Sequence, residues 1–347
     1  MTNSYIKSKP WTRNQPPKRI LAIRLQAMGD TVITLPYLQY LRNKLPANTV
    51  IDFLTREEVD SIPKNLELFN HVFSIGGGRN EKKQLLYATW LLPKLLLNHY
   101  DVVIDLQNNK VSNLVRHILQ PSAWSSFDRT SSHAAGERTL RTIEAAGFID
   151  CKADSSFTLK IKNDETALLK KNGWNGVSQL VVLNPAGAFE SRNWPIDNYI
   201  KFAELWLEQF PDTQFLLLGT SFIEKKSSYL KKILNGHLIN LVNKTSPAEA
   251  FSILQKTSFV LSEDSGLMHM SWVSGIPTIA LFGSTRSDWA RPLGSYTFFF
   301  DSSDLSCGNC MRQVCKYGDN RCMTRINSET VFEKAVSLVK PVHEQSL

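Results

Sequence analysis

The stretch "LSEDSGLMHMSWVSGIPTIALFGSTR", Leu261 to Arg286, joins two apolar segments through a short polar turn and a helical pattern. An apolar strand, a helix over Gly266–Ser274 and a second strand from Thr278 form the βαβ unit of a parallel sheet. Ligands of such open sheets bind beyond the carboxyl ends of the strands. The polar turn Asp264–Gly266 lies at such an end, so it indicates a binding site.

Length and composition limit what the chain can be. Its 347 residues exceed what one hydrophobic core usually serves, so we expect two domains. Hydrophobic residues make up 42% and charged residues 21%, which is ordinary for a soluble globular protein. The most apolar helix-like segment, Leu85–Leu97, is too short to span a bilayer, and the basic start lacks the apolar core of a signal peptide. We therefore expect a cytoplasmic protein.

Short apolar strands alternate with helical patterns in both halves of the chain. This alternation predicts an α/β fold of two Rossmann-like domains that face a cleft, with a boundary in the polar stretch Lys160–Ser178. The expected domains are a flexible basic tail over residues 1–18, a first domain over 19–165, and a second over 166–347 with a cysteine-rich loop at 307–322 and a C-terminal helix. The predicted strands are Ile20–Leu25, Val50–Leu54, Val72–Ile75, Val102–Leu106, Trp124–Phe127, Leu180–Asn184, Phe215–Leu218, Leu238–Leu241, Phe259–Leu261 and Thr278–Phe282.

A dinucleotide-dependent oxidoreductase would show the same alternation, but its glycine fingerprint is missing. That fingerprint is G-x-G-x-x-G after the first strand of a domain. After Leu25 the chain reads "QAMGD", and after Asn184 it reads "PAGAFESRNWP", with one glycine in each. The glycine-rich segment Gly76–Arg79 is not followed closely by a helix start at phosphate-loop spacing. The sequence therefore argues against a dehydrogenase.

Several segments together resemble one enzyme family. They are "RILAIRLQAMGDTVITLPYLQYLR" from Arg19, "NPAGAFESRNWP" from Asn184, "SEDSGLMHMSWVSGIPTIALFGST" from Ser262, and a run of four cysteines. These segments and their order along the chain resemble those of the family 9 glycosyltransferases, the heptosyltransferases of lipopolysaccharide core synthesis. The resemblance covers nearly the whole chain. The resemblance implies a GT-B fold, an ADP-heptose-type donor in the second domain and an anionic glycolipid acceptor in the first. It also implies that the sugar is transferred with inversion.

The resemblance places donor binding at the polar turn. Backbone N–H groups at the start of a helix bind pyrophosphate well, and Gly266 lets the chain approach without a Cβ atom. Asp264 would accept hydrogen bonds from sugar hydroxyls, although aspartate is also a good helix N-cap. His269, one turn later, is either part of the site or a satisfied core histidine. The other expected donor-binding residues are Gly187, Arg192, Glu224, Ser265 and Thr285.

Arg192 departs from the usual family pattern, and Glu224 has two possible interpretations. Arg192 occupies a place where the family usually has lysine, and it would neutralise the departing diphosphate with a bidentate contact. Glu224 could hold a ribose hydroxyl or be an ordinary surface carboxylate. No D-x-D pair of carboxylates marks a catalytic Mg²⁺ or Mn²⁺ site, so we expect catalysis without a metal cofactor.

Inverting transfer requires a base that removes the proton of the acceptor hydroxyl. The resemblance places this base at Asp30, between the first strand and the first helix, with Gly29 in a tight turn and Arg24 on the acceptor side. The alternative for Asp30 is a helix cap, because an apolar helical pattern follows it.

Four of the five cysteines fall within sixteen residues, as Cys307, Cys310, Cys315 and Cys322. In a cytoplasmic chain such clustering favours a metal site over disulfides, and Zn²⁺ on four thiolates is the natural occupant. Free thiols packed in a loop and a redox or iron–sulfur centre remain alternatives.

The first nineteen residues carry cations and no acid: Lys7, Lys9, Arg13, Lys18 and Arg19, with Trp11 among them. Such a segment is either a solvated tail or a contact with the inner face of the cytoplasmic membrane. Two rival functions are a catalytically silent sugar-nucleotide binder and a zinc-containing nucleic-acid binder. The second fits the net charge of +8 but does not explain Asp30 or Asp264. We therefore expect no nucleic-acid partner.

Overall fold

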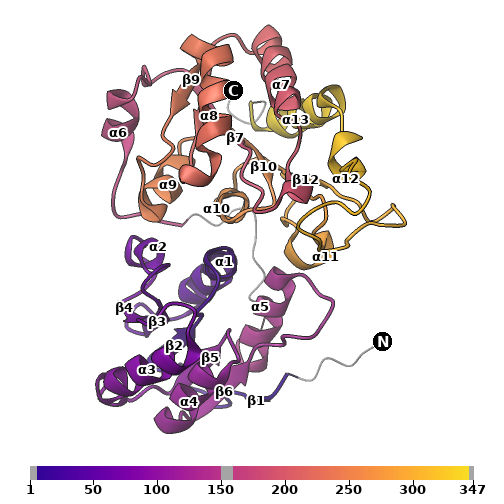
Figure 1. Ribbon diagram of the computed structural model, residues 1–347. Helices are drawn as coiled ribbons and strands as arrows, with labels where there is room; N and C mark the ends of the chain where they lie inside the picture. The colour runs from indigo at the N-terminus through magenta and orange to yellow at the C-terminus, as the bar shows by residue number, and fades with distance from the viewer. Residues whose placement is uncertain (1–5, 150–158, 344–347) are drawn as a thin grey trace. The chain divides into compact units, whose positions relative to one another are not determined.

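The computed structural model describes residues 6–149 and 159–343 and divides the chain into two compact units (Figure 1). Unit 1 is Met1–Lys162 and unit 2 is Asn163–Leu347, so the division falls inside the polar stretch 160–178. Each unit contains one six-stranded sheet. The predicted α/β fold with two parallel-sheet domains is confirmed.

The sheet of unit 1 has the strand order β1-β6-β5-β2-β3-β4. All neighbouring pairs are parallel except β1 with β6, which are antiparallel. Helices α3 and α4 pack together against one face of this sheet, and α1 packs against α5. The elements are β1 (Ser8–Lys9), β2 (Arg19–Ile23), α1 (Met28–Lys44), β3 (Val50–Arg56), α2 (Ser61–Lys64), β4 (His71–Ile75), α3 (Glu81–Leu96), β5 (Val102–Asp105), α4 (Lys110–Leu119), β6 (Ala123–Ser126) and α5 (Ala135–Ala145).

The sheet of unit 2 is entirely parallel, with the order β12-β11-β10-β7-β8-β9. Its elements are α6 (Thr166–Lys171), β7 (Gln179–Asn184), η1 (Glu190–Arg192), α7 (Ile196–Gln209), β8 (Thr213–Leu217), η2 (Ser221–Ile223), α8 (Glu224–Leu234), η3 (Asn235–His237), β9 (Leu238–Asn240), α9 (Pro247–Leu254), β10 (Phe259–Glu263), α10 (Gly266–Val273), β11 (Thr278–Leu281), α11 (Ser287–Ala290), β12 (Thr297–Phe300), α12 (Arg321–Thr324) and α13 (Ser328–His343).

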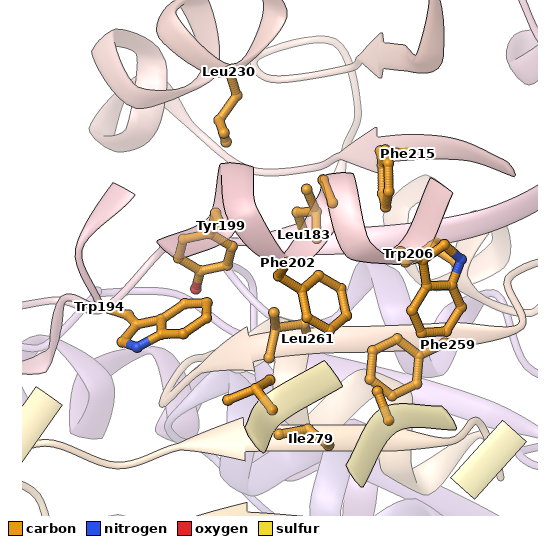
Figure 2. Close-up of a cluster of buried hydrophobic side chains, with 14 of the residues drawn as sticks. Leu183, Trp194, Tyr199, Phe202, Trp206, Phe215, Leu230, Phe259, Leu261 and Ile279 are labelled. Carbon is orange, nitrogen blue, oxygen red and sulfur yellow. The ribbon is translucent and has the colours of Figure 1, made fainter. Parts of the chain in front are cut away.

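The core of unit 2 depends on one aromatic face of α7 (Figure 2). Tyr199, Phe202 and Trp206 recur at helical spacing, so they point to the same side of the helix. The ring of Trp206 lies 5.1 Å from that of Phe259 on β10, and its Nε1 donates to Thr213 at 3.0 Å. Burial of these large rings anchors α7 to the sheet and so fixes the loop that precedes the helix.

The prediction of a flexible basic tail is wrong for residues 6–18. Ser8 and Lys9 form the edge strand β1 on β6, and Trp11 N–H donates to Ala146 at 2.8 Å. The backbone N–H of Lys18 donates to Asp101 at 2.7 Å. A two-residue strand has no periodic pattern, and strand β12 was also missed. Within the described residues, no helix is both long and apolar enough to cross a membrane.

Candidate active site

Three loops of unit 2 leave the sheet at one edge, because they follow neighbouring parallel strands. Ser262 pairs with Asn184, and Glu263 pairs with Leu281, so β7, β10 and β11 end at the same level. The loops after these strands contain six of the predicted donor-binding residues: Gly187, Arg192, Asp264, Ser265, Gly266 and Thr285. This edge is the place where open α/β sheets bind ligands.

Asp264 forms an ion pair and does not cap the helix. Its Oδ2 lies 3.2 Å from Nη1 of Arg192, and both side chains are mostly buried. The N-cap of α10 is Ser265, whose Oγ accepts the N–H of Met268 at 3.3 Å. The alternative of a plain N-cap is therefore wrong for Asp264. Its carboxylate adjoins the start of α10, and the N-terminus of a helix is a favourable place for phosphate groups.

Arg192 is held in place by its surroundings. Its guanidinium lies 4.4 Å from the ring centroid of Phe189, in addition to the contact with Asp264. Burial lowers the pKa of Arg192, and the charge of Asp264 opposes this shift. The arrangement presents one cation and one carboxylate side by side, so it can contact a phosphate and a hydroxyl at the same time.

Of the remaining predicted donor-binding residues, Thr285 lies in one of the three loops, whereas His269 and Glu224 do not. His269 is buried, and its Nδ1 accepts the indole N–H of Trp272 at 3.2 Å, which is the core-histidine alternative. Glu224 is exposed and begins α8, after a different strand. Thr285 is buried within the loop after β11, and its hydroxyl has no hydrogen-bond partner in the described part of the chain.

Glu263 is a residue that the sequence reasoning missed. It is fully buried at the end of β10, directly before Asp264. Its Oε2 accepts the N–H of Gly187 at 2.5 Å, and its Oε1 accepts the N–H of Trp194 at 2.7 Å. One carboxylate thus holds both ends of the loop that carries Arg192. The only feature of the sequence that could have indicated a role for Glu263 is its charge at the end of a mostly apolar strand.

Lys226 on α8 partly balances the buried charge of Glu263. Its Nζ lies 4.0 Å from the carboxylate and donates to the carbonyl of Pro185 at 2.8 Å and to Asn193 at 2.9 Å. Burial raises the pKa of Glu263 to about 7, against the opposing effects of Lys226 and the backbone N–H donors. Burial likewise lowers the pKa of Lys226.

Gly187 has a packing reason to be glycine. A Cβ atom there would lie 2.8 Å from the carbonyl oxygen of Arg192 and 2.9 Å from Oε2 of Glu263. Any side chain would push the loop off the carboxylate that holds it. Gly187 therefore helps to hold the loop that carries Arg192 and is not part of the ion pair between Arg192 and Asp264.

In unit 1, Asp30 lies at the third position of α1 and is partly exposed. Its Oδ2 accepts the N–H of Ala27 at 2.8 Å, and its Oδ1 lies 3.0 Å from Nη2 of Arg24. The capping contact is thus formed, and it leaves the carboxylate accessible. Gly29 lies in the first turn of α1 and not in a tight turn before it, which corrects that expectation.

Arg24 is buried next to Asp30 and is held on three sides. It donates to the carbonyl of Leu106, and its guanidinium lies 4.7 Å from the ring centroid of Phe127. The side chain of Gln107 accepts the N–H groups of Leu25 and Gln26, each at 3.0 Å. The loops after β5 and β6 thus position the turn that carries Asp30.

A cavity of about 790 Å³ opens beside these loops in unit 1. Its charged lining is mostly cationic, with Lys7, Arg116 and Arg129 against Asp128. Arg116 is mostly buried; its guanidinium lies 3.9 Å from the ring centroid of Trp124, and its Nε lies 3.9 Å from Asp105. The cavity therefore suits an acidic ligand with hydroxyl groups.

The four cysteines line one cavity of about 180 Å³ in unit 2. All are free thiols, and burial, followed by the nearby thiols, raises the pKa of Cys322. Within the described residues, no three His, Cys, Asp or Glu side chains are arranged so that they could hold a metal ion. The cysteine loop also contacts the donor loops, because Met311 N–H donates to Ser284 at 2.8 Å and Ser191 to the carbonyl of Arg312 at 2.5 Å.

The raised pKa of Glu263 makes a prediction about stability. Between the ordinary value of 4.5 and about 7, the folded protein keeps a proton that the unfolded chain has released. The free energy of unfolding contributed by this group therefore falls as the pH rises through this window, by up to about 3 kcal/mol. Glu263→Gln, which cannot ionise, should lack this contribution.

Urea unfolding from pH 4.5 to 8 checks this expectation, with Glu208→Gln on the exposed surface of α7 as the matched control. The stability of the wild type relative to Glu263→Gln should decline with rising pH. If the difference in the free energy of unfolding between wild type and Glu263→Gln stayed constant over this pH range, the proton would not belong to Glu263.

Comparisons with known proteins give the family of this chain. The model of glycosyltransferase family 9 (heptosyltransferase) matches residues 89–320. A lipooligosaccharide heptosyltransferase 2 from Campylobacter jejuni is 28% identical over 91% of this chain and 97% of its own length. By structure, a family 9 glycosyltransferase from Veillonella parvula has a TM-score of 0.78 at 17% identity, covering 93% of this chain and 97% of the other.

A second solved structure shares the fold. It is the Escherichia coli heptosyltransferase WaaC with ADP-2-deoxy-2-fluoro heptose, which has a TM-score of 0.60 at 16% identity and covers 91% of this chain and 99% of the other. The fold is thus that of the GT-B glycosyltransferases. Because the family model spans well over half of the sequence, this chain belongs to glycosyltransferase family 9 and is a glycosyltransferase.

Proposed function

We propose that this enzyme transfers a heptose from ADP-heptose to the growing core of a lipooligosaccharide or related glycolipid, with inversion at the anomeric carbon. The observation that carries the proposal is the Asp264–Arg192 pair at the start of α10, in a chain whose family is established. The names of its relatives, a heptosyltransferase 2 and a heptosyltransferase solved with an ADP-heptose analogue, support the choice of sugar and nucleotide.

On the donor side, we assign the diphosphate to the N-terminus of α10 and to Arg192, with Asp264 accepting hydrogen bonds from the sugar. Backbone N–H groups and a guanidinium both favour negative charge that develops on the leaving diphosphate. Glu263 and Lys226 hold the loop of Arg192 from behind, so its cation is positioned before the donor arrives. Catalysis by these groups needs no Mg²⁺ or Mn²⁺.

On the acceptor side, we assign the base to Asp30 and the binding of an anionic acceptor to the cationic cavity of unit 1. Phe127 lines the cavity and also lies against Arg24, the partner of Asp30. An acceptor in the cavity would therefore lie next to the residues that position the base. A silent sugar-nucleotide binder would have no use for this second site, and measured turnover separates the two functions.

Replacing Asp30 with asparagine should lower kcat by roughly 10²- to 10⁴-fold, the usual contribution of a general base. The amide can still accept the N–H of Ala27, so the start of α1 should persist. Steady-state kinetics with ADP-heptose and a delipidated core acceptor checks this, with Asp212→Asn on the exposed surface as control. Near-normal turnover in a folded Asp30→Asn protein would remove Asp30 from this role.

Replacing Asp264 with asparagine should weaken binding of the sugar nucleotide about tenfold or more, since a charged hydrogen-bond acceptor is lost. Binding of ADP alone should change much less, because ADP lacks the sugar. KM for the donor should rise while kcat changes little, as expected for an interaction shared by ground and transition states. Calorimetric titration with ADP and ADP-heptose measures both; equal losses for the two ligands would place Asp264 elsewhere.

We also propose that the four thiols bind one structural Zn²⁺. The loop between β12 and α12 contains no regular secondary structure, and loops of this length inside a compact domain are uncommon and usually functional when they are ordered. An ion would draw the four sulfurs that already share one cavity toward a common centre. Protein purified without chelators should then contain about one Zn²⁺ per chain by elemental analysis. Substoichiometric zinc from supplemented medium would contradict the site.

A further inference from the structure

Helix α3 is apolar on two opposite faces, although only one of them meets the core. Its buried face carries Ala88, Leu92 and Leu95. On the other side Leu86, Trp90 and the C-cap residue Leu97 are 60%, 81% and 78% exposed. At about 100° per residue these three side chains fall within about 40° of one another around the helix axis. We call them the α3 stripe.

The α3 stripe is flanked by cations. Lys82, Lys83 and Lys94 are exposed on the same helix, on either side of the stripe, and Tyr87 is 49% exposed beside them. The helix has one acidic residue, Glu81, whose carboxylate lies 3.5 Å from Lys110 Nζ of α4. The exposed face of α3 is therefore apolar along its middle and positive at its edges.

We propose that this face of α3 docks on the surface of an anionic lipid bilayer, an inference that rests on the proposed lipid-linked acceptor. Tryptophan, tyrosine and leucine insert between headgroups, while lysine stems lie along the interface and their ammonium groups contact anionic headgroups. Sixteen residues make a helix about 24 Å long that would lie in the plane of the membrane.

Charge argues against a second copy of the chain as the occupant. In a symmetric dimer the same face meets itself, so the lysines beside one stripe would approach those beside the other. Like charges in a partly desolvated interface repel, whereas an anionic bilayer neutralises all three lysines.

The position of α3 connects the stripe to the acceptor. Helix α3 packs on α4, and α4 contributes Asn113 and Arg116 to the cationic cavity of unit 1. A glycolipid anchored in the bilayer would thus present its saccharide close to the helix that lines this cavity. The N-terminal segment, for which a membrane contact was one of two alternatives, is held by β1 on β6, and its Lys7 lines the cavity.

The test uses the full chain and vesicles of phosphatidylglycerol with phosphatidylethanolamine, compared with pure phosphatidylcholine. Trp90→Ser with Leu97→Ser should lower the partition coefficient onto anionic vesicles by more than tenfold. Changing Lys82, Lys83 and Lys94 to glutamine should lower it by about fivefold for each lysine. The matched controls, Val177→Ser at an 89% exposed site and Lys225→Gln with Lys232→Gln, should bind like the wild type.

Kinetics separates this inference from the proposed function. The stripe variants should turn over a delipidated acceptor normally and a vesicle-embedded acceptor poorly. If the wild type transfers no heptose while vesicle binding still depends on the stripe, the proposed function fails and the docking surface stands. Unchanged vesicle binding in the stripe variants would overturn the docking surface, as would an altered sedimentation mass without any change in vesicle binding.

Discussion

The buried carboxylate of Glu263 is the constraint on which the donor half of the site depends. A carboxyl group buried inside a protein needs hydrogen-bond partners, and the backbone N–H groups of Gly187 and Trp194 supply them. This requirement ties the loop after β7 to the end of β10. Arg192 lies on that loop and Asp264 follows Glu263 directly, so the same contact brings the ion pair together.

In unit 1, buried side chains also hold the loops by accepting backbone N–H groups. The side chain of Gln107, after β5, accepts two backbone N–H groups in the turn before α1. Asp105, at the end of β5, is fully buried and accepts the N–H groups of Gln107 and Asn108. Burial raises the pKa of Asp105, which fits a structural carboxylate and not an accessible base. Asp30 is the carboxylate that these contacts leave accessible.

The charge distribution of the chain has two separate uses in unit 1. The cations that line the cavity, Lys7, Arg116 and Arg129, suit the acidic groups of a saccharide. Cations beside the α3 stripe are exposed and suit a charged surface. The net charge of +8 does not show these two groups of cations, because it is a sum over residues that lie on different surfaces of the folded protein.

The sequence by itself determined the α/β class, most of the strands and the family, since apolar periodicity and local motifs survive without tertiary information. It also placed Asp264 directly after a strand and Asp30 near the start of the first helix, because such positions are local properties. Only the tertiary structure decided that Ser265 caps α10, that His269 belongs to the core, and that the basic start is an edge strand. The edge strand depends on β6, which is distant in sequence, and Asp264 leaves the cap to Ser265 while pairing with Arg192, also distant in sequence. The clearest case is Glu263, whose hydrogen-bond partners lie about seventy residues away in the chain.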